Sequence, residues 1–250
     1  MTRPRRTDDG AHPPARPDPS AGVFETIRAE GGAALFLADH LARLRASVRA
    51  LYGTALGDEL DDCVADALGT APDDAVRRVR VVAKPSTQNA VVLHANLAPL
   101  GAAAERNVVR LRAWTLAGGL GAHKWADRRA LDEAAERLDA TPLIVEPDGE
   151  VLEAAWGNVW ALEANRLLTP PADGRILPGV TRARLLVLAG ELGLTPAEEC
   201  LSLQRLARAD AILLTSSLRL AVAGRLAGEP GGRVAKVADA IAAALRERAV

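Results

Sequence analysis

The feature of this sequence that most constrains its fold is the way in which its strand-like runs are joined. Residues 143–145 and 151–153 are apolar runs separated by a short stretch with Asp148-Gly149, a dipeptide typical of β-hairpin turns. A second pair, residues 159–162 and 167–169, is also separated by only a few residues. Hairpins join antiparallel strands, whereas a parallel sheet needs a longer crossover, usually a helix, between strands. Because helical patterns occur elsewhere in the chain, the sequence predicts an α+β fold.

Composition divides the chain into a tail and two domains. Residues 1–20 hold five prolines among charged and small residues, which predicts a disordered tail. Residues 21–116 alternate between helical and strand-like patterns and are predicted to form an N-terminal α/β domain. The run 117–122 contains three glycines and is predicted to be the linker to a C-terminal domain, residues 123–250.

Charge and cysteine content argue against several classes of partner. The net charge of −1 gives no electrostatic reason to expect binding to nucleic acid or to an anionic membrane. Cys63 and Cys200 lie far apart and form no C-x-x-C pair, which favours a reducing cytoplasm over a disulfide framework or a zinc site. No apolar run approaches the ~18 residues needed to span a membrane, and no apolar segment of a secretory signal follows the N-terminal arginines.

Lysine usage points to one candidate for chemistry. The motifs H-E-x-x-H, G-x-S-x-G and G-x-x-x-x-G-K-[ST] are all absent, and the four histidines show no metal-ligand spacing, so we expect no metal. Of 31 basic side chains only Lys84, Lys124 and Lys236 are lysine. A desolvated lysine amine can form an imine with a carbonyl, whereas arginine stays protonated. Lys84 and Lys236 suit a strand end and a solvated helix face, but Lys124 follows the linker, where clefts form.

Five segments in order resemble the fold-type IV pyridoxal-phosphate (PLP) enzymes, which are the class IV aminotransferases and the aminodeoxychorismate lyases. They are GVFETIRAEGGAALFLADHLARLRASVR (22–49), HKWADRR (123–129), VLEAAWGNVW (151–160), LLTPPADGRILPGVTR (167–182) and ADAILLTSS (209–217). The resemblance implies a two-domain fold like that of D-amino-acid aminotransferase. It also implies PLP as cofactor, bound by the C-terminal domain, a small-molecule substrate and a homodimer.

The resemblance gives roles to three residues around the PLP ring. Lys124 matches the catalytic lysine that binds PLP as a Schiff base. Glu153 matches the carboxylate that keeps the pyridine nitrogen protonated, so that the ring can accept electrons. An ordinary acid in an exposed hairpin is the alternative for Glu153. Asn158 is expected to brace Glu153 or the phenolic side of the ring, and its alternative is a turn residue.

Phosphate binding is expected at the start of a helix. Gly179, Val180 and Thr181 open a helix with apolar residues at helical spacing. The free N–H groups and the dipole of such a terminus favour an anion. Without the resemblance, Pro178-Gly179 indicates only a turn before a helix.

Side chains from two other segments are expected at the phosphate. Arg43 matches the arginine that clamps it, and its alternative is a solvated helix face shared with Arg45 and Arg49. Ser217 matches a residue whose hydroxyl and backbone hold the phosphate from the far side. Ser216 takes this role if the register differs by one.

The most specific function that the resemblance implies is 4-amino-4-deoxychorismate lyase of folate biosynthesis, which gives 4-aminobenzoate and pyruvate. The run 123–129 resembles the lyases, and Arg129 stands where branched-chain aminotransferases have tyrosine. The proline-rich tail replaces a hairpin that usually begins these enzymes. The alternatives are a branched-chain or D-amino-acid aminotransferase and a non-catalytic PLP-binding protein. Substrate contacts are expected from Thr26 and Arg28, although Arg28 could instead point to solvent.

Overall fold

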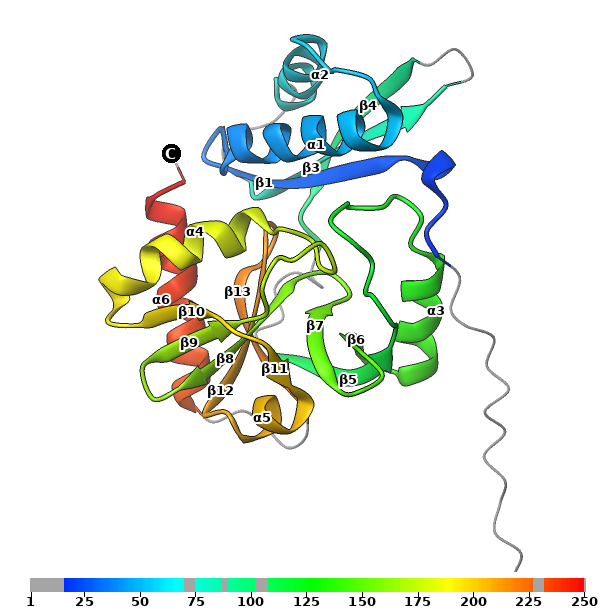
Figure 1. Ribbon diagram of the computed structural model, residues 1–250. Coiled ribbons are helices and arrows are strands. Elements are labelled where there is room, and N and C mark those ends of the chain that lie inside the picture. The colour runs from blue at the N-terminus through cyan, green and yellow to red at the C-terminus, as the bar shows by residue number, and fades with distance from the viewer. Residues whose placement is uncertain (1–15, 70–74, 87–89, 102–107, 227–231, 250) are drawn as a thin grey trace, which may run out of the picture.

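The computed structural model describes residues 16–69, 75–86, 90–101, 108–226 and 232–249, and its strands form two sheets (Figure 1). The first sheet has the order β2-β1-β3-β4, with β1 (Val23–Glu30), β2 (Ala33–Ala34), β3 (Arg77–Pro85) and β4 (Val91–Pro99). The second has the order β10-β9-β8-β12-β13-β5-β6-β7-β11, with β5 (Val108–Thr115), β6 (Thr141–Val145), β7 (Glu150–Ala154), β8 (Asn158–Glu163), β9 (Arg166–Thr169), β10 (Thr195–Glu198), β11 (Leu201–Ser202), β12 (Ala211–Ser216) and β13 (Leu220–Arg225). The helices are η1 (Pro19–Ala21), α1 (Leu37–Tyr52), α2 (Glu59–Leu68), α3 (Arg129–Leu138), α4 (Val180–Leu188), η3 (Ala189–Leu192), α5 (Leu203–Arg208) and α6 (Gly232–Glu247).

The first sheet is covered by helices on one face. β1 pairs antiparallel with β2 and β3, and β3 pairs antiparallel with β4. Val23 and Ile27, which share one face of β1, pack in one core with Leu41 and Leu44 of α1 and with residues of α2. The opposite face of β1 is directed toward the second sheet (Figure 1), where Arg28 Nη1 donates to the carbonyl oxygen of Leu218 at 2.8 Å.

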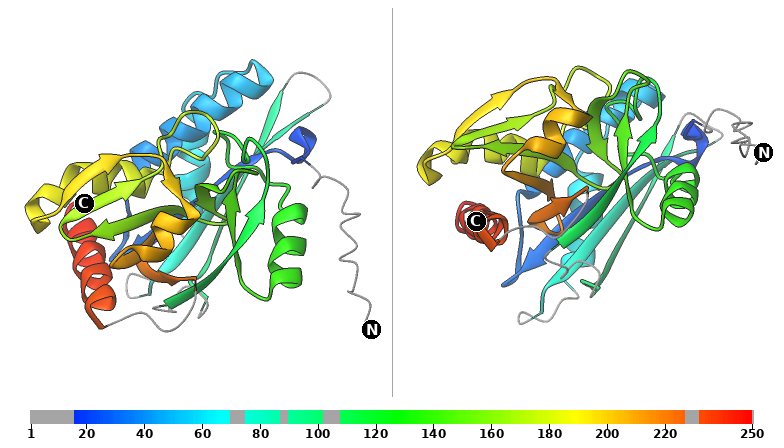
Figure 2. Two further views of the ribbon diagram at one scale, coloured as in Figure 1. Left: turned by 60° about the horizontal axis from the view of Figure 1, so that its bottom comes forward. Right: turned by 90° about the horizontal axis from the view of Figure 1, so that it is seen from below.

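The second sheet contains both hairpins that the sequence predicts. β6 pairs antiparallel with β7, β8 pairs antiparallel with β9, and β12 and β13 form a third hairpin. α4 and α6 pack on one face of this sheet against Trp160 and Leu213, and α5 packs on the other face against Val151 and Leu201. α3 and α6 lie at opposite sides of the molecule (Figure 2). The mixture of hairpins and helices confirms the α+β fold.

The crossing between the two sheets differs from the expected boundaries. The sequence predicts that residues 108–115 belong to the N-terminal domain and that 117–122 is the linker. Instead, β5 pairs in parallel with β6 and with β13, so it belongs to the second sheet. The change from one sheet to the other therefore falls between β4 and β5 in the chain. An apolar strand pattern does not specify which strand is its partner, and here the partners follow β5 in the chain.

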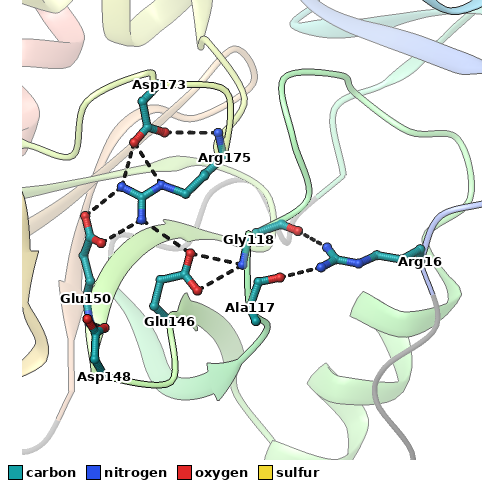
Figure 3. A network of polar contacts seen from close by, with 9 residues as sticks. Arg16, Ala117, Gly118, Glu146, Asp148, Glu150, Asp173 and Arg175 are labelled. Carbon is teal, nitrogen blue, oxygen red and sulfur yellow. Dashed lines mark hydrogen bonds and ion pairs between the residues drawn. The ribbon is translucent and has the colours of Figure 1, made fainter.

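The described chain begins before the end of the expected tail. The guanidinium of Arg16 donates to the carbonyl oxygens of Ala117 and Gly119 (Figure 3). The backbone N–H of Asp18 donates to Asp127 at 3.0 Å, and the Tyr52 hydroxyl donates to the carbonyl oxygen of Pro19 at 2.8 Å. Residues 16–20 are thus fastened to the rest of the protein by contacts that composition does not encode. The remainder of the expected tail lies outside the described residues.

Among the helices of the described residues, none is long and apolar enough to cross a membrane.

These contacts make a prediction about truncation. We expect a variant that lacks residues 2–19 to be less stable than one that lacks residues 2–15, because only the first loses the hydrogen bonds of Arg16, Asp18 and Pro19. A net contribution of about 0.5 to 1.5 kcal/mol for each of the four bonds gives a difference of at most about 2 to 6 kcal/mol. Thermal unfolding of the two variants at equal concentration measures it. Equal melting temperatures would show that the contacts of residues 16–19 contribute nothing to stability.

Candidate active site

A cavity lies between the loop after β5 and the turn that joins β7 to β8. Lys124 and Glu153 both line it, together with Arg128, Trp156 and Leu177. The structure therefore brings together two side chains that lie far apart in the sequence and that the resemblance assigns to the same cofactor ring. We refer to this cavity as the Lys124 cavity.

Backbone hydrogen bonds to the first sheet hold Lys124 in place. The carbonyl oxygen of Lys124 accepts the N–H of Phe24 at 2.9 Å, and the N–H of Ala126 donates to the carbonyl oxygen of Gly22 at 2.9 Å. The loop thus runs along β1 as an additional short strand, with Trp125 opposite Val23. The position of the lysine is therefore determined by the first sheet, although its cavity is lined by residues of the second.

Burial and neighbouring cations make the Lys124 amine weakly basic. Burial, together with the positive charges of Arg43 and Arg128, lowers the pKa of Lys124 to about 8, against the opposing effect of Glu25 and Glu153. The amine also lies 5.1 Å from the centre of the Phe24 ring. A substantial fraction of this amine is therefore neutral and nucleophilic near neutral pH.

Glu153 is a buried acid on β7. Its residue is only 6% exposed, and its two carboxylate oxygens accept the backbone N–H of Leu177 at 3.2 and 3.3 Å. Burial raises the pKa of Glu153 to about 8, although this hydrogen bond and the charge of Lys124 oppose the shift. The alternative of an exposed hairpin acid is wrong. A cationic ring nitrogen next to this carboxyl would favour its ionised form.

Asn158 fixes the same segment as Glu153. The Asn158 amide donates to the carbonyl oxygen of Leu177 at 2.9 Å, so Leu177 is held through both its N–H and its C=O. A Cβ at Gly179 would lie 1.9 Å from Asn158 Oδ1, which explains the glycine at this position. Because the buried Asn158 is hydrogen-bonded to Leu177, it braces the segment 177–179, which also binds Glu153.

This segment is also anchored from its other end. Arg175 forms ion pairs with Glu150 at 2.7 Å, with Asp173 at 2.6 Å and with Glu146 at 3.4 Å (Figure 3). The Glu146 carboxylate also accepts the N–H of Gly118 at 3.0 Å. The two loops that carry Lys124 and Leu177 are thus joined at the surface by one network.

The structure places the start of α4 beside Arg43. Gly179 is the N-cap residue of α4, and Val180 is its first residue. Arg43 Nη1 donates to the carbonyl oxygen of Pro178 at 2.9 Å, and Arg43, Gly179 and Val180 line an open groove. Thr181 is 2% exposed, and its hydroxyl has no hydrogen-bond partner in the described part of the chain. The helix terminus and Arg43 could together hold an anion, with a spare hydroxyl close by.

Arg43 itself is held by a buried carboxylate. Its Nε and Nη2 donate to the two oxygens of Glu25 at 2.7 and 2.8 Å, and His40 contacts the same carboxylate at 2.9 Å. Burial opposes ionisation of Glu25, but Arg43 and His40 lower its pKa to about 2. Arg43 is therefore not on a solvated face, which corrects the alternative interpretation of this helix.

The serines lie at the end of β12. Ser216 Oγ accepts the N–H of Arg219 at 3.4 Å, and Ser216 Cβ lies 3.6 Å from the place of a Cβ at Gly157, a residue that lines the Lys124 cavity. Ser217 lies in the turn that follows β12. The structure thus places Ser216 next to the cavity wall and leaves the choice between the two serines as a prediction.

Thr26 and Arg28 do not line the Lys124 cavity. Both residues are buried on β1, and Arg28 forms an ion pair with Glu30 at 2.8 Å in addition to its bond to Leu218. The interpretation of Arg28 as a solvent-directed side chain is wrong. Its charge is already compensated, and it connects the two sheets.

Sequence reasoning missed two arginines near the cavity. Arg128 lines it and donates to the carbonyl oxygen of Ala155 at 2.7 Å. The guanidinium carbon of Arg80 lies 3.8 Å from the centre of the Phe24 ring, whose neighbour is Lys124. Arg129, which the sequence analysis compared with the tyrosine of relatives, has a side chain that is 74% exposed and paired with Asp127. The alternation of side chains along β3 could have placed Arg80 on the face toward the cavity, but only if the partner strand of β3 had been known.

Comparisons with known proteins identify similar sequences and a similar fold. The family model described as amino-transferase class IV matches residues 22–225. A D-alanine aminotransferase of Bacillus licheniformis is 32% identical over 87 residues, which are 35% of this chain and 31% of that protein. A branched-chain-amino-acid aminotransferase of Escherichia coli K12 is 32% identical over 75 residues, which are 30% of this chain and 24% of that protein. The matched part is thus a third or less of the length of these relatives.

A solved structure matches the chain over nearly its whole length. It is described as a hypothetical aminotransferase from Mycobacterium tuberculosis in its PLP-bound form. The superposition has a TM-score of 0.81 at 23% sequence identity and covers 97% of this chain and 95% of that chain. The two proteins share a fold.

The raised pKa of Glu153 predicts how stability depends on pH. In the cofactor-free protein, Glu153 keeps its proton in the folded state up to about pH 8, whereas the unfolded chain loses it near its ordinary value of 4.5. The free energy of unfolding should therefore fall between pH 5 and pH 8, and Glu153→Gln should abolish about 3 to 5 kcal/mol of that decrease. Urea unfolding at several pH values measures it, with the exposed Glu247→Gln as control. Parallel curves for wild type and Glu153→Gln would contradict the shift.

Proposed function

Because the chain belongs to the amino-transferase class IV family, we propose that it is an enzyme that uses PLP to move an amino group from an amino acid to a 2-oxo acid. The observation that carries the proposal is that Lys124 and Glu153 line one cavity. The curated relatives are aminotransferases for D-alanine and for branched-chain amino acids, which supports amino transfer over other reactions of PLP.

The residues of this chain fit PLP in three respects. Lys124 offers an amine whose lowered pKa makes it reactive toward a carbonyl. Glu153 offers a buried carboxyl without a hydrogen-bonded cation in the described residues, which suits a protonated ring nitrogen. The start of α4, with Arg43 bonded to Pro178 and the unpartnered hydroxyl of Thr181, offers donors for the phosphate.

Each of these residues then has a task in the reaction. When bound, PLP supplies a carbonyl carbon that reacts with amines and a ring that accepts the electrons released at the substrate carbon. Lys124 takes the proton from the α-carbon of the amino acid and later returns one, as a general base and acid with a pKa close to the working pH. Glu153 holds a proton on the ring nitrogen. Asn158 keeps Leu177, and through it the Glu153 carboxylate, in position.

A protein that only binds PLP is a weaker interpretation. Burial raises the pKa of Glu153, so its ionised form costs stability in the absence of a cation. A protein that only binds PLP has little use for such a buried acid, because an acid at the ring nitrogen helps the ring to accept electrons and does not serve affinity. The buried Glu153 therefore favours an enzyme.

Aminodeoxychorismate lyase is the second candidate. The run 123–129 resembles the lyases, and the residue five positions after Lys124 is Arg129, whose largely exposed guanidinium pairs with Asp127. No tyrosine hydroxyl is available from that position, which weakens the similarity to branched-chain aminotransferases. Both candidates use the same cofactor residues, so a reaction assay must separate them.

We also propose that the enzyme is a cytoplasmic homodimer. The homodimer follows from the family resemblance. The free thiols of Cys63 and Cys200 are compatible with a reducing compartment. Sedimentation of the purified protein measures the subunit number.

The role of Lys124 has a direct chemical test. Borohydride treatment of the purified yellow protein should attach a pyridoxyl group to Lys124, and Lys124→Arg should abolish the label and lower turnover by at least about 10³-fold, because arginine cannot supply the amine. Lys84→Arg and Lys236→Arg, at exposed positions, are matched controls and should keep the label. Mass spectrometry of peptides locates it. A label on Lys84 or Lys236 would overturn the assignment.

The need for an acceptor separates the two reactions. An aminotransferase given D-alanine, L-leucine or L-glutamate alone should release no more than one 2-oxo acid per active site, and many when 2-oxoglutarate or pyruvate is added. A lyase should give pyruvate and 4-aminobenzoate from aminodeoxychorismate over many turnovers without any acceptor. We expect the first result. Repeated turnover of aminodeoxychorismate, with no acceptor-dependent reaction of any amino acid, would favour the lyase.

A further inference from the structure

We propose that the segment Arg16-Pro17-Asp18 is part of the active site and that Arg16 is a positioning residue for Lys124. Its guanidinium holds the glycine-rich loop that precedes the lysine. The inference rests on the proposed role of Lys124. It adds a residue that acts through the loop rather than on the reacting atoms.

The loop before Lys124 consists of residues that lose much conformational freedom on folding. Gly118, Gly119 and Gly121 have φ values of +73°, +59° and +82°. Glycine adopts such left-handed conformations readily, but fixing a glycine costs more conformational entropy than fixing any other residue. The position of the amine therefore depends on contacts that restrict this loop.

The Arg16 guanidinium supplies two of these contacts. Its Nη1 donates to the carbonyl oxygen of Gly119, and its Nη2 donates to that of Ala117 (Figure 3). Two donors of one planar group fix the orientation of the loop as well as its distance. From the other side, the Glu146 carboxylate accepts the N–H of Gly118 at 3.0 Å (Figure 3). The loop is therefore held between the N-terminal segment and the second sheet.

A second contact of the same segment lies beyond Lys124 in the sequence. The N–H of Asp18 donates to the Asp127 carboxylate at 3.0 Å. Asp18 is itself fixed, because its own carboxylate accepts the N–H of Ser20 at 2.9 Å and the hydroxyl of Ser20 at 2.8 Å. Pro17 joins the two anchors, and its restricted φ limits how far they can move relative to each other. The segment thus holds the chain both before and after the lysine.

Arg16 and Pro17 also line the Lys124 cavity. The bonds to β1 fix the main chain at Lys124 and at Ala126, whereas Arg16 fixes the part of the loop that precedes them. The end of the proline-rich segment is therefore a wall of the site as well as a clamp on the loop that carries its amine.

A looser loop should affect the reaction more than the binding of substrate. A displacement of about 1 Å between reacting groups can lower a rate about 100-fold. The groups expected to bind the phosphate, Arg43 and the start of α4, belong to other segments. Loss of the Arg16 contacts should therefore lower kcat and leave KM nearly unchanged.

Hydrogen exchange and steady-state kinetics of the full-length protein test the proposal. In Arg16→Gln, we expect the backbone amides of residues 117–127 to exchange at least fivefold faster, in the cofactor-free protein and in the holoenzyme, because the loop opens more often. We also expect kcat to fall at least tenfold with KM changed less than threefold. Arg16→Lys should lie between wild type and Arg16→Gln in both measurements, because an ammonium group lacks the planar fork that reaches both carbonyl oxygens.

The matched control is Arg45→Gln. Arg45 also donates to two backbone carbonyl oxygens, those of Leu56 at 3.2 Å and of Gly57 at 3.0 Å, but it does not line the Lys124 cavity. This variant loses bonds of the same kind away from the site. We expect it to change kcat and the exchange of residues 117–127 less than twofold.

The outcomes separate this inference from the proposed function. Unchanged exchange or unchanged kcat in Arg16→Gln would overturn the positioning role. Equal effects of Arg45→Gln would also overturn it, because they would indicate a general loss of stability. If Arg16→Gln fails to fold, as judged by circular dichroism, Arg16→Lys decides by the same two measurements. Faster exchange in Arg16→Gln, with a wild-type protein that transfers no amino group, would overturn the proposed reaction alone.

Discussion

Two backbone hydrogen bonds between β1 and the loop of Lys124 organise the site. They join Phe24 N–H to the Lys124 carbonyl oxygen and Ala126 N–H to the Gly22 carbonyl oxygen. Gly22 has a φ of +93°, and a Cβ there would lie 2.5 Å from the carbonyl oxygen of Ala83, so glycine is needed where β3 approaches this closely. The turn into β1 thus determines where the reactive amine lies, about one hundred residues further along the chain.

A chain of polar contacts extends from β1 to the start of α4. Glu25, on the helix-covered face of β1, fixes Arg43, and Arg43 donates to the Pro178 carbonyl oxygen. On the other side, Glu153 and Asn158 hold Leu177 by its N–H and C=O. Residues 177–179 are therefore determined by both sheets, and the donors at the start of α4 inherit that position. The same contacts surround Lys124 with charges that act on its pKa.

Local patterns predicted much of the fold, and non-local contacts account for the rest. Asp148-Gly149 marks the β6–β7 hairpin, and the apolar runs after it become β8 and β9, because turn chemistry and alternation are properties of neighbouring residues. The membership of β5 could not be predicted, since its partners β6 and β13 follow it in the chain. Likewise, Arg16 gains its partners only when the loop of Ala117 and Gly119 comes near.

The candidate site likewise contains residues that the sequence identified and residues that only the structure shows. Lys124 was identified from the chemistry of its amine, and Glu153 and Asn158 from motifs that contain them, although their roles stay predictions. Arg80 and Arg128 were missed because their positions depend on the register of β1 and β3 and on the residues that line the cavity, which the sequence does not show. Arg129 was compared with a tyrosine although its neighbour Arg128 is the fixed wall residue, because sequence does not show which of two adjacent arginines turns inward.

The attachment of Lys124 to one sheet and Glu153 to the other has a mechanical consequence. The main chain of Lys124 is bonded to β1, whereas Glu153 belongs to β7. A rigid-body rotation of the first sheet would move the Lys124 amine but not the Glu153 carboxyl. The distance between these two groups therefore depends on the angle between the sheets. The Arg28–Leu218 hydrogen bond joins the two sheets near the end of β1 that lies away from Lys124, so its loss would change the angle between the sheets. Substitutions distant from the cavity could thus alter the reaction through geometry alone.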